Sequence, residues 1–197
     1  MTAPSLPTYE FFVHARIVMG IVVGLGITRI LTGIASFIQH PDRNQASLLH
    51  LLWAGSMLFE FVLFWWWEFG LTRVDKWNLG IFLFLIGYAV VLYLLAALLF
   101  PDHISEYAGY EDFFIKRRRW FFALLATGFV LDVADTIIKG SEYWNRLSRD
   151  YVIQVPVGLV LCLIGILTSN RRLQIALVII NITYQLYLTS RIISVGQ

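Results

Sequence analysis

The sequence predicts an all-α integral membrane protein, a bundle of six transmembrane helices in a single domain that covers residues 1–197. Six long apolar stretches follow one another, each near the length of about 20 residues that a helix needs to cross a bilayer. Composition agrees, because 58% of the residues are hydrophobic and only 14% are charged. Barrel strands would alternate apolar and polar residues, whereas these stretches are continuous and therefore indicate helices.

Polar loops and turn residues separate the six predicted spans. The spans are predicted at residues 11–37, 47–69, 77–100, 118–138, 151–167 and 173–193. Pro41 and Pro101 follow the first and third spans, and Gly140 is predicted to end the fourth. The third loop, residues 102–119, is the longest, and it is either an interfacial helix or an extension of the fourth span.

The first span is expected to remain in the protein as a membrane helix. Residues 1–10 lack the basic region of a signal peptide, and no small-residue cleavage pattern follows a short apolar core. The protein is expected to be a multi-pass protein of a bacterial-type inner (plasma) membrane. The lipid bilayer is therefore the first partner that the sequence predicts.

Several classes of site are not indicated by the sequence. The net charge of +2 is too small to suggest nucleic-acid binding. Cys162 is the only cysteine, so it forms neither an internal disulfide nor a cysteine-based metal site. The chain has no phosphate-binding loop, HExxH, GxSxG or CxxC motif. We therefore expect no catalytic residues, no metal and no cofactor, and a membrane enzyme or a quinone or haem binder is the least favoured class.

Four ionisable residues lie inside the apolar segments, where a charge is costly and usually faces a partner, a cavity or a pathway. They are Arg29, Glu60, Asp132 and Asp135. Counting about 1.5 Å per helical residue places Glu60 and Asp132 within a turn of each other in depth. Asn181 and Gln185 lie near the same level of the sixth span. Together these residues predict an ion or proton pathway built around one polar layer.

The two aspartates lie three residues apart, on one face of the fourth span. Two carboxylates this close disfavour each other's ionised form unless a cation lies between them, which suits a proton relay or a cation site. The structural alternative places Asp135 near the interface and pairs Asp132 with an arginine. Arg29, flanked by Gly26 and Gly33, is expected either to form an internal ion pair with Glu60 or Asp132, or to serve as an anion-coordinating or gating charge.

A small residue recurs at every fourth position of the first span. The stripe consists of Gly20, Gly24, Thr28 and Thr32. Small residues allow helix backbones to approach closely in a membrane, so the stripe predicts a helix contact within the chain or with another copy.

The function that these features favour is a small oligomeric ion channel or an ion- or proton-coupled transporter. Glu60 and Asp132 would respond to the ion or proton, and Arg29 would supply the counter-charge. The expected partners are a second copy of the chain in a homo-oligomer and a small ion or a proton. The alternative is a non-catalytic membrane partner or sensor protein whose buried charges only hold the bundle together.

Overall fold

Six long α-helices form the protein, as the sequence predicts. The computed structural model describes residues 8–40, 47–74 and 76–195. Its elements are α1 (Thr8–Gln39), α2 (Leu48–Trp67), the 3-10 helix η1 (Glu68–Arg73), α3 (Leu79–Ala97), the 3-10 helix η2 (Ile104–Glu106), α4 (Tyr110–Ile138), α5 (Ser141–Leu167) and α6 (Arg171–Val195). All six α-helices are long and apolar enough to cross a bilayer, which makes this a multi-pass membrane protein.

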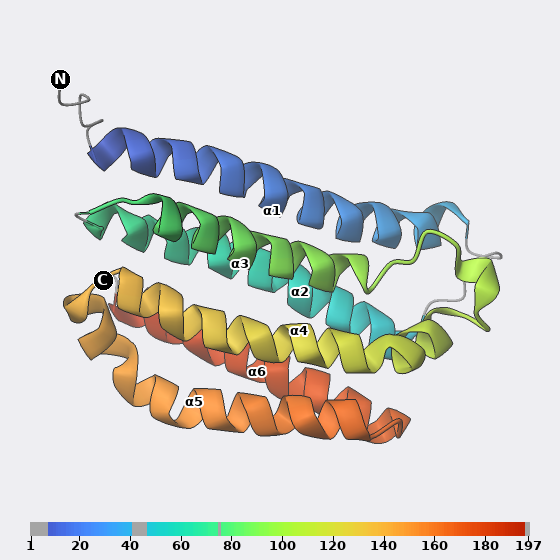
Figure 1. The fold of residues 1–197 in the computed structure, drawn as a ribbon. Coiled ribbons are helices and arrows are strands. Elements are labelled where there is room, and N and C mark those ends of the chain that lie inside the picture. Colours follow the sequence, from blue (N-terminus) through green and yellow to red (C-terminus); the bar gives the residue numbers. More distant parts are fainter. Residues whose placement is uncertain (1–7, 41–46, 75, 196–197) are drawn as a thin grey trace.

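The helices lie side by side, and successive helices run in opposite directions (Figure 1). Helix α1 forms one edge of the bundle and packs on α3, and α5 forms the opposite edge and packs on α4. Helices α2 and α6 contact each other between these two edges. The start of α1 and the end of α6 lie at the same end of the bundle, together with η1 and the turn between α4 and α5.

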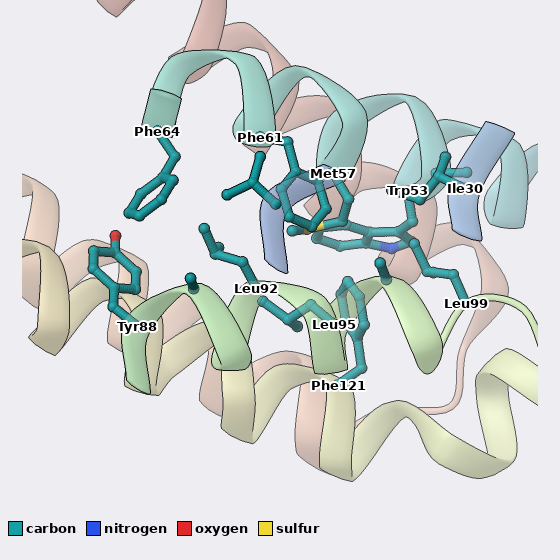
Figure 2. Close-up of a cluster of buried hydrophobic side chains, with 14 of the residues drawn as sticks. Ile30, Trp53, Met57, Phe61, Phe64, Tyr88, Leu92, Leu95, Leu99 and Phe121 are labelled. Carbon is teal, nitrogen blue, oxygen red and sulfur yellow. The ribbon is translucent and has the colours of Figure 1, made fainter. Parts of the chain in front are cut away.

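An apolar core joins all six helices, and Figure 2 shows the part of it that lies among the first four. Its centre is Trp53 of α2, whose ring lies edge-on to that of Phe121 of α4 with the ring centroids 4.8 Å apart. Helix α1 approaches closely because Gly26 leaves room for the ring of Phe61. A Cβ atom on Gly26 would lie only 2.2 Å from Cζ of Phe61, so any larger residue here would have to displace the buried ring of Phe61. At one end of the core, Phe64 faces Tyr88 at a centroid distance of 4.9 Å.

The third loop was predicted to be either an interfacial helix or an extension of the fourth span, and the start of α4 decides between them. Helix α4 begins at Tyr110, so the part of the loop from Tyr110 onward is an extension of the fourth span. Glu111 and Asp112 lie in the first turn, where negative charge interacts favourably with the helix dipole. Asp112 also pairs with Lys116 one turn later, at 2.7 Å. At its other end, α4 stops as predicted before Gly140, whose φ of +106° favours glycine.

Candidate functional site

An acidic cavity of about 80 Å³ lies among α2, α3, α4 and α6. Four carboxylic side chains line it: Glu60 of α2, Glu68 of η1, and Asp132 and Asp135 of α4. Glu60 and Asp132 are partly accessible, as expected for side chains on a cavity wall, whereas Glu68 and Asp135 are buried. The volume has room for more than one water molecule. We refer to this space as the acidic cavity.

The polar layer predicted at the level of Glu60 exists, and α6 supplies its amides. The amide nitrogen of Gln185 donates to Oε2 of Glu60 at 2.7 Å. The hydroxyl of Ser56 donates to Gln185 at 3.1 Å and accepts from Asn181 at 2.8 Å. Asn181, Gln185 and Asp132 all line the acidic cavity with Glu60. The structure therefore brings together the four residues that the helical rise predicted to lie at one depth. Their role in an ion or proton pathway stays a prediction.

Asp132 is oriented by a tyrosine from the neighbouring helix. The hydroxyl of Tyr151 of α5 hydrogen-bonds to the carboxylate of Asp132. The same hydroxyl lies 2.7 Å from Oγ1 of Thr136, which stands one turn after Asp132 in α4. Both Tyr151 and Thr136 are buried. The polar chain fixes the position of Asp132 without bringing a positive charge to it.

A buried ion-pair cluster closes the end of the acidic cavity nearest the termini. Lys139, the residue after α4, lies 3.2 Å from Oε1 of Glu68 and makes a short contact with Asp135 one turn earlier. The three side chains are at most 3% exposed. Among the residues that the structure describes, Lys139 is the only cation within ion-pair distance of any of the four carboxylates.

Three buried oxygens on the cavity wall have no hydrogen-bond partner among the described residues. They are Oε2 of Glu68, Oδ1 of Asp135 and the hydroxyl oxygen of Tyr184. Leaving a buried polar atom unsatisfied costs about 1–3 kcal/mol, and more when the group is charged. Such atoms in a polar cavity are usually satisfied by water or by an ion. The described residues of the acidic cavity therefore leave these three oxygens without a hydrogen-bond donor or a cation.

Arg29 does not pair with Glu60 or Asp132, so that expectation is wrong. Its guanidinium donates to the backbone oxygen of Phe100 and to Asp102, each at 2.5 Å, in the loop after α3. This loop and the end of α4 lie at opposite ends of the bundle (Figure 1). The hydrogen bond and charge of Arg29 hold the pKa of Asp102 below its ordinary value. The pairing was mispredicted because the long side chain of Arg29 extends to Asp102, in the loop that follows α3. Lys139 supplies the counter-charge that was assigned to Arg29.

The small-residue stripe of α1 contributes little to packing within the chain. Gly20 lies against Trp65, but an added Cβ on Gly24 would meet nothing within 4 Å. Thr28 and Thr32 are exposed. The glycines of α1 with the closest neighbours are Gly26, against Phe61, and Gly33, against Phe100, and neither belongs to the stripe. Three of the four stripe residues therefore face outward, toward lipid or another molecule.

Several polar residues of this region were not predicted. They are Ser56, Glu68, Lys139, Tyr151, Gln154 and Tyr184. The spacing of four between Asp135 and Lys139 is a signal that could have indicated their pairing. Within the described part of the chain, no group of three or more His, Cys, Asp and Glu side chains is arranged to hold a metal ion. The chain matches no protein-family model, no curated protein and no solved structure.

Proposed function

We propose that the protein is a small channel or an ion- or proton-coupled transporter whose acidic cavity takes up a cation or protons. The observation that carries this proposal is the charge balance of the cavity. Four carboxylic groups line it, and Lys139 is the one cation that the described residues pair with them. If all four were ionised, the cluster would hold a net charge of −3 inside a membrane protein. Excess charge at such depth is costly, so protons or a bound cation must offset it.

The accessible members of the cavity are the best candidates for this exchange. Glu60 is held by an amide and Asp132 by a hydroxyl, so neither carboxylate is neutralised by its hydrogen-bond partner. Both can therefore change protonation, or bind a cation, without breaking an ion pair. Asp135 is already paired with Lys139, so we assign it to the closed end of the pathway rather than to the exchanging group.

A second candidate function has a specific observation in its favour. The cluster of Lys139, Glu68 and Asp135 is buried and held by two ion pairs, as expected for a membrane partner or sensor whose buried charges are structural. The unpartnered oxygens and the accessible carboxylates of Glu60 and Asp132 favour transport instead. A purely structural cluster would pair all of its carboxylates, because each unpaired buried charge is destabilising.

We also propose a homo-oligomer in a bacterial-type inner (plasma) membrane. The outward position of Gly24, Thr28 and Thr32 leaves a small-residue face free for a second α1 helix. A helical bundle suits an inner membrane, since outer-membrane proteins of the common type are β-barrels.

The test of the proposed site is proton release on cation binding. Sodium or potassium chloride is added to the purified protein in weakly buffered detergent solution, and the pH change is recorded. We expect the wild-type protein to release protons as the cation replaces them, and the variants Glu60→Gln and Asp132→Asn to release fewer. Asp112→Asn, which removes a carboxylate near the start of α4, serves as the matched control and should behave like wild type. Absence of release from the wild-type protein would count against a cation that exchanges with protons.

A further inference from the structure

A second hollow adjoins the acidic cavity. This groove, of about 300 Å³, lies among α4, α5 and α6. The groove and the acidic cavity share four lining residues: Phe129, Gln154, Asn181 and Tyr184. Because the same side chains form a wall of both spaces, the groove lies directly beside the acidic cavity.

The outer rim of the groove is mostly apolar and aromatic, and the one carboxylate among the described residues that line the groove, Asp150, is paired with Arg191 at 2.8 Å. Ile153 and Val157 of α5 are 68% and 50% exposed, and Ile180 and Tyr187 of α6 are 46% and 53% exposed. The groove forms because α5 packs closely on α4, where Gly158 meets the ring of Phe129, and contacts α6 much less. Since these helices span the membrane, the groove opens sideways toward the acyl chains of the lipid.

We propose that the groove admits an amphiphilic organic cation from the bilayer and that the acidic cavity receives its charged head. This proposal rests on the proposed function, for which it names the class of substrate. A hydrocarbon tail fits the apolar rim formed by Ile153, Val157 and Ile180, whereas an inorganic ion gains nothing from an apolar lateral opening.

The walls between rim and cavity suit the head of such a molecule. The rings of Phe129 and Tyr184 stand at the junction, and aromatic faces attract organic ammonium groups. The hydroxyl of Tyr184 has no hydrogen-bond partner among the described residues, so it is available to a ligand. Beyond them lie Glu60 and Asp132, which provide the opposite charge. The acidic cavity, at about 80 Å³, is small, so the body of the molecule would remain in the groove.

The experiment measures binding of hexyltrimethylammonium to the purified protein in lipid nanodiscs by titration calorimetry. Hexanol serves as the uncharged control, and tetramethylammonium as the control without a tail. We expect saturable binding of hexyltrimethylammonium and much weaker binding of both controls. Val157→Trp, which fills the groove, should weaken binding by about tenfold or more. Val160→Trp is the matched control, because Val160 is 56% exposed on the same helix but does not line the groove.

The outcomes separate this inference from the proposed function. The proposal is wrong if the wild-type protein does not bind hexyltrimethylammonium. It is also wrong if Val157→Trp and Val160→Trp weaken this binding equally, because only Val157 lines the groove. If the organic cation does not bind but protons are still released when sodium or potassium is added, the proposed cation site in the acidic cavity is retained. Only the proposal of an organic substrate is then rejected. If neither the organic cation nor the inorganic cations have any effect, both proposals fall. Both tryptophan variants are first checked for a wild-type melting temperature.

Discussion

The ammonium nitrogen of Lys139 lies 3.2 Å from Oε1 of Glu68, although the two residues are 71 positions apart in the chain. Neither side chain is more than 1% exposed. The pair joins the end of α4 to η1, and Asp135 contributes a second carboxylate to the same lysine. This cluster fixes one end of the acidic cavity and leaves Glu60 and Asp132 as the unpaired acids of its interior.

Replacing Lys139 with methionine should destabilise the protein. The change strands two buried carboxylates, and breaking a buried ion pair typically costs about 3–5 kcal/mol. We expect a clear fall in the melting temperature in detergent. The triple variant that also carries Glu68→Gln and Asp135→Asn should recover most of it, because no unpaired charge remains.

The matched control for this prediction is Lys116→Met. Lys116 forms the same kind of pair one helical turn from Asp112, but its side chain is 57% exposed. An exposed pair contributes at most about 1 kcal/mol, so the melting temperature should change little. Equal effects of the two lysine substitutions would show that the cluster of Lys139 is not a buried ion pair in solution.

The contact between Arg29 and Asp102 should make stability depend on pH in the acidic range. Because Arg29 lowers the pKa of Asp102 from its ordinary 3.8, the pair contributes fully above that value. Its contribution is lost as the pH falls through the lowered pKa of the folded protein. The difference in melting temperature between wild type and Arg29→Gln should therefore shrink below about pH 3.8.

A second substitution shows which acid is the partner of Arg29. Asp102→Asn should remove most of the pH dependence, whereas Glu60→Gln should leave it intact. The assignment would be wrong if the substitution at Glu60, and not the one at Asp102, abolished the difference between wild type and the Arg29 variant.

Two glycines of α1 should respond differently to enlargement. Gly26→Leu forces a side chain into the ring of Phe61 and should lower the melting temperature, since overpacking typically costs about 1–3 kcal/mol. An added Cβ on Gly24 meets nothing within 4 Å, so Gly24→Leu should leave the melting temperature of the monomer unchanged and weaken only the oligomer. Size-exclusion chromatography with light scattering distinguishes the two effects. An oligomer that survives Gly24→Leu intact would exclude the outward stripe as its interface.

The helices were predictable because a bilayer imposes a simple requirement on sequence. A span must be apolar over about 20 residues, so the positions of the six helices follow from composition alone. The ends were harder to place where the chain is polar. Helix α4 starts at Tyr110 and α5 at Ser141, because charged turns there continue each helix beyond its apolar part. Hydrophobicity carries no signal for such extensions, whereas the stop at Gly140 had a local signal in its glycine.

The candidate site was predictable in depth, but most of its contacts between helices were not. Counting residues along each span placed Glu60, Asp132 and Gln185 at one level, because helical rise is constant. Counting does not tell which face of a helix meets which neighbour. Lys139 and Glu68 stood at span ends, where charges usually contact headgroups, so their burial could not be anticipated.

The most direct test of the proposed transport is ion flux from proteoliposomes between about pH 5 and pH 8, where the protonation of buried carboxylates can change. We predict that the wild-type protein carries a cation or proton flux that varies with pH across this range. Glu60→Gln and Asp132→Asn should abolish the flux or change its pH dependence while the variants stay folded, and Asp112→Asn should match wild type. A wild-type protein that stays silent with every common cation, anion and proton gradient would contradict the transport function and favour a structural membrane partner.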